Sequence, residues 1–300
     1  MEIAGDMATD ERIQEIRSDL GIDKPILTQY SDYLSSLLRG DLGESYFTNR
    51  SVSTEILERL PSSLELVIPS LVFACLIGLV IGSTAAYFRA RTPDRAVRVV
   101  ISFVQSVPDF LLALTLIYVV FFILGIAPAP VGRFGLLETK PDPVTYFYTV
   151  DALIASDLKL FKSILWHMLL PVLSLSVVYS VYFAKTTRAA MNVAFASPQI
   201  EFARACGLRE RTVFHYALLT ARTPILTYGA ILTGALVGGA AIVETIFAWR
   251  GLGQWALISM LKLDLPVIQG FVLVVGAFTL LIYLVLDIVI LYLDPRISYR

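Results

Sequence analysis

The sequence predicts an all-α membrane protein, a polytopic bundle of helices, and three observations carry that prediction. Hydrophobic residues make up 56% of the chain and charged residues only 16%, which is far from the composition of a soluble domain. The mean hydropathy is +0.72. Five apolar runs also reach the length of about 20 residues that a helix needs to cross a bilayer core. We therefore expect five spans, at residues 64–88, 99–126, 163–184, 224–247 and 267–293.

The distribution of Lys and Arg between these runs predicts the orientation of the bundle. Segments 89–98 and 185–222 have a clear excess of basic residues, whereas basic and acidic residues are balanced in 127–162 and nearly so in 248–266. Short connections rich in Lys and Arg stay in the cytoplasm, so the first two should be cytoplasmic and the other two should face outward. Alternation then places the C-terminal tail inside and residues 1–63 outside.

The outward start is unusual, because residues 1–63 contain neither an apolar helix nor the h-region of a signal peptide. We expect a preceding membrane helix upstream of Met1, which would give six spans. The alternative is a five-span protein whose acidic start crosses the membrane unaided. In either case the chain divides into an extracytoplasmic N-terminal segment, 1–63, and a membrane domain, 64–295.

Within the N-terminal segment, short patterns predict local structure. Residues 10–17 have the spacing of a surface helix that Gly21 would end. Residues 40–43 (GDLG) predict a turn, and 54–60 predict one or two amphipathic helical turns broken at Pro61, just before the first span.

The most distinctive polar stretch lies in the second basic connection, at residues 201–207 (EFARACG). Ser197 can cap a helix, Pro198 suits its first turn and Gly207 can end it, so we expect a helix of about two turns. Ala203 and Gly207 are four residues apart and should share one face, which would let a partner approach the backbone closely. A docking site for a partner and a solvated loop that binds lipid headgroups both fit this pattern.

This stretch resembles the EAA loop of ABC importer permeases, the element that docks on the ATP-hydrolysing subunit. Glu201, Ala203 and Gly207 stand in the spacing of the motif, while Phe202 replaces its usual second residue. Nearly the whole chain is similar to dipeptide and oligopeptide permeases, although Arg250 and Tyr283 stand where that subfamily usually has proline and often asparagine. The matching segments are GDLGES (40–45), ERLP (58–61), HMLLP (167–171), Arg188, Pro224, VETIFAWRGLG (243–253), DLP (264–266) and DPR (294–296).

The resemblance implies the transmembrane domain of a type I ABC importer, usually with six helices, and a coupling loop at about residues 185–223. The chain would be a permease without an ATPase of its own, in the cytoplasmic (inner) membrane of a prokaryote. Its partners would be a homologous second permease, two ATP-binding cassette subunits that bind ATP and Mg²⁺, an extracytoplasmic solute-binding protein and the lipid bilayer. The residues expected to dock on the ATPase are Glu201, Ala203, Arg204, Ala205 and Gly207.

The sequence does not determine which solute is transported. The resemblance favours di- and oligopeptides, but relatives of this permease type also carry nickel chelates, glutathione or oligosaccharides. Pro108 and Asp109 lie inside the second expected span, where an acid is expensive and by default functional. They could line a solute path, or Asp109 could pair with a neighbouring helix or subunit. Glu244 and Asp287 lie near span ends, where water can reach them, and we expect them to be anchors.

Two glycine pairs have the small-xxx-small spacing that permits close helix packing, in GLVIG (78–82) and GALVG (234–238). Such pairs say nothing about the solute. They predict only where two membrane helices approach each other closely.

Catalysis has little support in the sequence. No lysine follows a glycine as in a phosphate loop, and His167 and His215 form no zinc-ligand cluster. We expect no catalytic residue, cofactor or metal site in the chain and no nucleic-acid partner. A secondary transporter should show broken helices at matching places in two halves, and an intramembrane enzyme should show paired catalytic groups; neither pattern is present.

Overall fold

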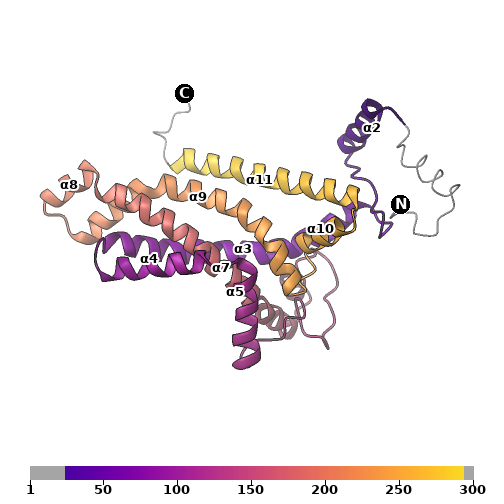
Figure 1. Cartoon of the computed structure of the whole chain (residues 1–300), viewed down its shortest axis with the longest axis horizontal. Helices are drawn as coiled ribbons and strands as arrows, with labels where there is room; N and C mark the ends of the chain where they lie inside the picture. The colour runs from indigo at the N-terminus through magenta and orange to yellow at the C-terminus, as the bar shows by residue number, and fades with distance from the viewer. Residues whose placement is uncertain (1–23, 294–300) are drawn as a thin grey trace.

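The computed structural model describes residues 24–293, which form an elongated bundle of helices (Figure 1). Four long helices run along the molecule: α3 (Val52–Tyr87), α7 (Leu158–Phe195), α9 (Glu210–Ile246) and α11 (Leu265–Leu293). Each is long and apolar enough to cross a membrane. No strand occurs among the described residues, and the all-α prediction is confirmed.

The second expected span is present only as a bent pair of helices. α4 (Thr92–Gln105) follows the long helices, whereas α5 (Asp109–Leu116) and its π-helical continuation η1 (Ile117–Ile123) turn away from them (Figure 1). The bend is 97°. Pro108 explains the break, because proline has no N–H and disfavours helical backbone at the residue before it. The span expected over residues 99–126 is therefore present as a bent pair of helices, interrupted at Pro108.

Three long helices extend beyond their expected ends. α3 begins at Val52 and continues through Pro61, so the expected break at that proline is wrong. α7 runs on to Phe195 and α9 already begins at Glu210. The basic connection thus shrinks from residues 185–222 to a short segment around α8 (Pro198–Ala205).

Burial explains these extensions. In the added part of α7 the buried residues recur every three or four positions, and the same holds for α9, so each helix keeps one face in the core. Packing of that face stabilises helix that the apolar runs alone did not indicate. The buried residues are Thr187, Met191 and Ala194 in α7 and Val213, Ala217 and Ala221 in α9.

The two ends of the bundle carry different elements. At one end, α8 joins α7 to α9, and the ring of Tyr87 at the end of α3 lies 6.3 Å from that of Phe195 and 6.0 Å from that of Phe214. Both basic segments start from this end, as the predicted orientation requires, and we call it the basic end. The opposite end, which we call the outer end, carries α2 (Ile26–Leu38), α6 (Tyr148–Ile154) and α10 (Leu252–Leu261).

Close packing of α3 on α7 depends on Gly78 and Gly82, the first of the two glycine pairs found in the sequence. A Cβ added to Gly78 would lie 2.6 Å from the backbone oxygen of Ser180, and one added to Gly82 would lie 2.5 Å from that of Ala184. The second pair behaves differently, because a Cβ on Gly238 would meet nothing within 4 Å. The prediction of close packing at Gly238 is therefore wrong.

The turn predicted at residues 40–43 is confirmed. Gly40 and Gly43 have φ values of +79° and +83°, and the Gly43 N–H donates to the Asp41 carboxylate at 2.9 Å. The helix expected at 10–17, Gly21 and the terminal segment 294–296 lie outside the described residues.

Candidate functional site

α8 is a helix of about two turns at the basic end, and its C-terminus closes in a Schellman motif. Gly207 has a φ of +74°, and its N–H donates to the carbonyl oxygen of Arg204 at 2.9 Å. The Leu208 N–H donates to the carbonyl oxygen of Ala203 at 3.2 Å, which completes the motif. The predicted helix end at Gly207 is confirmed, but the hydroxyl of Ser197 makes no capping bond.

One face of α8 belongs to the core of the bundle. Ile200 is 1% exposed and Ala203 is 5% exposed, and both lie in the same buried cluster as Met191 of α7 and Val213 of α9. Ala203 therefore anchors α8 to the long helices instead of sharing an outward face with Gly207, as the spacing had suggested. The exposed residues of this segment include Glu201, Phe202, Arg204, Ala205 and Gly207.

Arg204 orients α8 against its neighbours. Its Nε lies 3.5 Å from Glu210 Oε1 at the start of α9, and its guanidinium lies 5.8 Å from the ring centroid of Phe195 at the end of α7. Both partners of the ion pair are about half exposed, so the pair adds at most about 1 kcal/mol to stability. Its effect is mainly to limit the rotation of α8.

A buried ion pair joins the first basic segment to α7. Arg188 donates to Asp94 through Nε at 2.6 Å and through Nη2 at 3.1 Å, and the Ala90 N–H donates to the same carboxylate at 3.0 Å. Asp94 is 1% exposed. Arg188 was expected in a cytoplasmic loop, but it lies on α7, where it holds the start of α4.

At the bend between α4 and α5, polar groups gather on the side of α7 and α9. Asp109 is half-buried at the first position of α5, where the helix dipole favours a carboxylate, and Pro108 is exposed. A Cβ on Gly239 would collide with the Tyr179 hydroxyl and lie 3.6 Å from an Asp109 oxygen, so both groups converge on this glycine. The Tyr179 hydroxyl also donates to the carbonyl oxygen of Ala235 at 3.0 Å.

Next to these groups, towards the basic end, lies a polar cavity that the sequence did not lead us to expect. Its volume is about 570 Å³. Tyr182, Lys185 and Thr186 place it on one face of α7, at the three- and four-residue spacing that continues from Tyr179. This spacing of polar residues could have indicated a polar face on α7. In the sequence, Lys185 was instead counted with the basic connection. The cavity is lined by Gln105, Tyr182, Lys185, Thr186, Ala189 and Tyr228.

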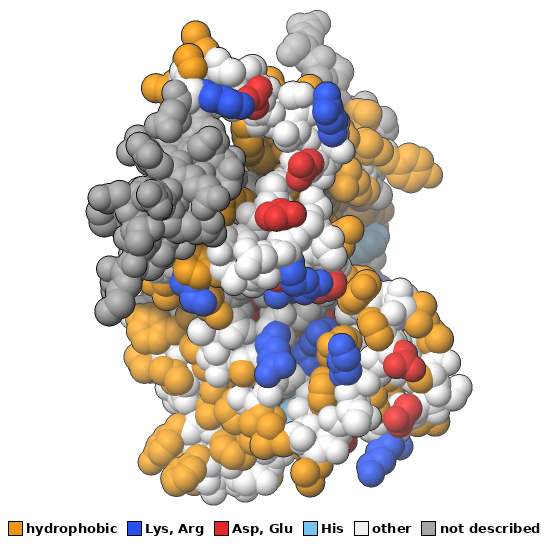
Figure 2. All heavy atoms as spheres, turned by 90° about the vertical axis from the view of Figure 1, so that its right-hand side faces the viewer, with side chains coloured by type: hydrophobic (Ala, Val, Ile, Leu, Met, Phe, Trp, Pro, Cys, Tyr) orange, Lys and Arg blue, Asp and Glu red, His pale blue; other side chains and the backbone are white. Residues whose placement is uncertain are grey.

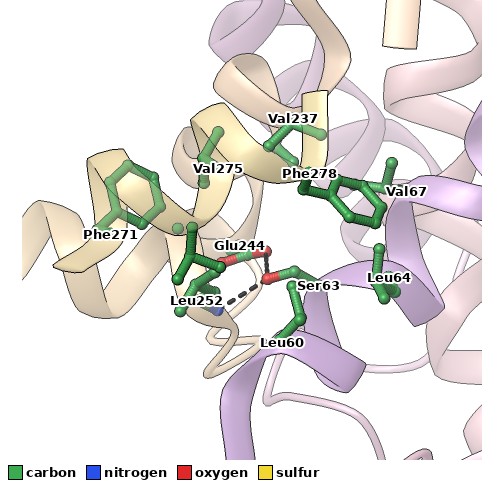
Figure 3. Close-up of a pocket in the computed structure, with 13 residues that line it drawn as sticks. Leu60, Ser63, Leu64, Val67, Val237, Glu244, Leu252, Phe271, Val275 and Phe278 are labelled. Carbon is green, nitrogen blue, oxygen red and sulfur yellow. Dashed lines mark hydrogen bonds between the residues drawn. The ribbon is translucent and has the colours of Figure 1, made fainter. Parts of the chain in front are cut away.

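At the outer end, Glu244 of α9 holds three helices together (Figure 3). Its carboxylate accepts from the Ser63 hydroxyl of α3 at 2.5 Å and from the Gln254 N–H of α10 at 2.8 Å. Ser63 in turn accepts from the Leu252 N–H at 2.7 Å. α10 is thus capped by residues of other helices, since Gly251 at its N-cap has no side chain to do so.

The same junction explains why a glycine precedes α10. A Cβ on Gly251 would lie 2.5 Å from the carboxylate of Glu244. Glu244 is an anchor, as expected, but it is 0% exposed, so the expectation that water reaches it is wrong. Beside it lies a small apolar space of about 20 Å³, towards which Figure 3 shows Phe271, Val275 and Phe278.

A second buried ion pair fixes the outer connection between η1 and α6. Arg133 Nη1 lies 3.3 Å from Glu65 Oε2, and the guanidinium lies 3.3 Å from the ring centroid of Tyr148. Burial lowers the pKa of Arg133, while the neighbouring Glu65 acts in the opposite direction. Seen from the outer end, charged side chains of both signs extend from the top of the view through its middle to the lower right, and hydrophobic ones gather along the sides (Figure 2).

Comparison with known proteins places most of the chain within two family models. Residues 78–299 match the model described as binding-protein-dependent transport system inner membrane component. Residues 1–67 match the model for the N-terminal part of a binding-protein-dependent transport system membrane component.

Curated relatives match over almost the whole chain. A probable D,D-dipeptide transport system permease protein of Escherichia coli strain K12 is 38% identical over 99% of this chain and 87% of the relative. A di/tripeptide transport system permease protein of Pseudomonas aeruginosa strain UCBPP-PA14 is 36% identical over 94% of this chain and 83% of the relative. A dipeptide transport system permease protein of E. coli K12 is 32% identical over 97% and 86%, respectively.

Among solved structures, the fold matches a crystal structure of an amino acid ABC transporter with histidines. The TM-score is 0.55 at 17% sequence identity, and the match covers 79% of this chain and 92% of the other. The fold is therefore that of a type I ABC importer permease.

Proposed function

The chain belongs to the family of binding-protein-dependent transport system inner membrane components, and on this premise we propose that it is the permease subunit of an ATP-driven peptide importer. In this role it crosses the cytoplasmic membrane beside a homologous second permease. Two ATP-binding subunits energise the pair from the cytoplasm, and an extracytoplasmic solute-binding protein delivers the solute. The chain itself forms the path and does not hydrolyse ATP.

The geometry of α8 is the observation that carries this proposal. α8 is exposed along Glu201, Ala205 and Gly207, yet Ile200 and Ala203 fix it in the core shared by α7 and α9. A subunit that binds the exposed side would therefore move the two long helices with it, because well-packed cores transmit displacement. Docking on the outward side and anchoring through Ala203 are separate roles within one short helix.

Short peptides are the solutes that the relatives favour. The three relatives described above are named as permeases for D,D-dipeptides, di- and tripeptides, and dipeptides. We extend this solute class to the present chain. Residues 1–63 would then face the solute-binding protein, and 64–295 would form the membrane domain whose coupling element is α8 with its flanking residues.

A reconstituted importer tests both parts of the proposal. The chain, its second permease and the ATP-binding subunits are placed in proteoliposomes with the solute-binding protein, and uptake of D-alanyl-D-alanine and L-alanyl-L-alanine is measured with and without ATP. In Glu201→Lys the ATP-binding subunits should be lost during purification and uptake should be abolished. The control Asp142→Lys makes the same charge change at an exposed residue of the outer end and should retain both the subunits and uptake.

The two parts of the proposal fail in different ways. Normal retention of the ATP-binding subunits by Glu201→Lys, together with normal uptake, would refute docking on α8. If the wild-type importer hydrolyses ATP in response to the binding protein but carries neither dipeptide, the solute class is wrong while the importer role stands.

A further inference from the structure

Lys185 is an unusual cation, because it lines a polar cavity and has no ionic partner. Among residues 24–293 it forms no ion pair, whereas Arg188, one turn further along α7, is bound to Asp94 through two hydrogen bonds. The side chain of Lys185 is exposed to the cavity of about 570 Å³. No carboxylate of the described residues therefore lies within 4 Å of its ammonium group.

Lys185 directly follows the apolar run of residues 163–184, so it lies at the cytoplasmic end of that expected span. It lies ten residues before α7 ends at Phe195, which corresponds to about 15 Å along the helix axis. Its neighbour Ala184 packs on Gly82, and α3 ends five residues later, at Tyr87. A cation at the end of a span that pairs with no described carboxylate is a candidate for a functional role.

The remaining lining of the cavity is rich in hydrogen-bond donors. Tyr182 and Tyr228 carry hydroxyl groups and Gln105 carries an amide, whereas the Thr186 hydroxyl donates to the Tyr182 carbonyl oxygen of its own helix at 3.4 Å. Together with a Lys ammonium, these groups suit an anion that accepts several hydrogen bonds. The volume lies within the range of about 300–1,000 Å³ that is typical of small-molecule sites.

Two tyrosines of α7 lie between this cavity and an acid. The ring centroids of Tyr182 and Tyr179 are 6.4 Å apart, and the Tyr179 hydroxyl and the carboxylate of Asp109 converge on Gly239. Lys185 is six residues after Tyr179, which places it about 9 Å nearer the basic end and about 120° around α7 from that tyrosine. A short peptide has the same arrangement of charges, an ammonium at one end and a carboxylate at the other.

We propose that the cavity is a transient solute site in which Lys185 binds the terminal carboxylate of a peptide, with the ammonium of the peptide directed towards Asp109. This inference rests on the proposed function. A phospholipid headgroup or a carboxylate of the second permease could bind the Lys185 ammonium in place of the peptide. The experiment below distinguishes these three ligands.

The test uses the complete importer in proteoliposomes and follows dialanine, in the enantiomer that the wild type transports. Lys185→Met removes the charge but keeps an unbranched side chain, Lys185→Arg keeps the charge, and Lys159→Met is the matched control on the exposed outer end of the same helix. Three quantities are measured for each variant: dialanine imported per ATP hydrolysed, ATP hydrolysis stimulated by the binding protein, and anionic phospholipid that co-purifies.

Lys185→Met should lower dialanine imported per ATP about tenfold, as the loss of one charge-assisted contact implies. Lys185→Arg should retain most of the transport, Lys159→Met should be unchanged, and stimulated ATP hydrolysis should be normal in all three. Retention of the second permease and the ATP-binding subunits should also be normal, which separates a solute site from a structural contact.

Three results would overturn the site while leaving the importer function intact. The first is unchanged transport by Lys185→Met, and the second is loss of the second permease or of ATP hydrolysis, which would make Lys185 a subunit contact. The third is loss of bound anionic phospholipid with normal dialanine per ATP, which would make it a lipid contact. Absence of ATP-driven dialanine uptake by the wild type would overturn the proposed function and the site together.

Discussion

Replacing Ser63 with alanine should destabilise the outer end of the bundle, because one hydroxyl serves two buried partners there. Ser63 donates to the carboxylate of Glu244 at 2.5 Å and accepts from the Leu252 N–H at 2.7 Å. Glu244 is 0% exposed and Leu252 is 2% exposed, so water cannot readily replace either contact. In Ser63→Ala the carboxylate loses a donor and the N–H is left without an acceptor.

The magnitude follows from these two losses. A hydrogen bond to a charged group contributes about 1.5–3 kcal/mol, and an unsatisfied buried N–H costs about 1–3 kcal/mol. Because the site can relax in part, we expect a fall of about 3 kcal/mol in the free energy of unfolding. For a chain of this size such a loss corresponds to a lower unfolding midpoint by roughly 5–10 °C.

The assay is thermal unfolding of the purified protein in detergent, followed by tryptophan fluorescence. Trp249 and Trp255 are 1% and 8% exposed and lie near this junction, so the signal reports on it directly. Ser70→Ala is the matched control, since Ser70 is also buried on α3 but its hydroxyl donates only to the Leu66 carbonyl oxygen of its own helix, at 2.7 Å. Equal midpoints for the two variants would refute the assignment of Ser63 to the junction.

Three further changes test other parts of the structure. Gly207→Val requires a β-branched residue at a φ of +74°, so it should distort the end of α8 and abolish retention of the ATP-binding subunits; membrane insertion, checked by fractionation, should be normal. Asp94→Ala leaves Arg188 half-buried without its partner and should lower the free energy of unfolding by about 3 kcal/mol in denaturation experiments, whereas no loss would show that the pair is dispensable. Gly78→Ala places a Cβ 2.6 Å from a backbone oxygen of α7 and should lower the unfolding midpoint, while Gly238→Ala meets nothing within 4 Å and should not; the reverse order would contradict the close packing of α3 on α7.

Hydrophobicity predicted the existence of the spans well but not their ends. The apolar runs reflect the length of helix that lipid surrounds, whereas helix ends depend on packing within the protein. Met191 and Ala194 continue the buried face of α7, and Val213 and Ala217 begin that of α9. Their spacing is helical in the sequence, but charged neighbours made these segments resemble a loop.

Proline shows why the second span is bent while the others are continuous. Pro61, Pro171 and Pro224 lie within continuous helices, while Pro108 separates two. Of these four prolines, only Pro108 is followed directly by an acid. A proline followed by an acid is also the pattern of a helix start, with a carboxylate in the first turn. The sequence therefore contained a signal for a new helix at Asp109, although it could not supply the angle of the bend.

Charge within the membrane domain could be assigned only when neighbours were known. Glu244 near a span end looked accessible to water, yet donors from α3 and α10 enclose it. Lys185 followed an apolar run and was counted with Arg188 as loop charge, yet the structure gives Arg188 a partner and leaves Lys185 facing a cavity. Spacing could suggest the proposed docking motif because its residues lie within one short segment, 201–207. Ser63, Glu244 and Leu252 are far apart in the chain, so no spacing could indicate that they meet.

α9 is one of the long helices that connect the two ends of the molecule. α9 is a continuous helix from Glu210 to Ile246, about 55 Å long, and it contacts α8 near Val213 and binds α3 and α10 through Glu244. A movement imposed on α8 would act on α9, because Ile200 and Ala203 are buried in the core cluster that also contains Val213. If α9 moves as one body, Glu244 moves with it. The hydrogen bond from the Gln254 N–H to this carboxylate would then carry the movement to α10.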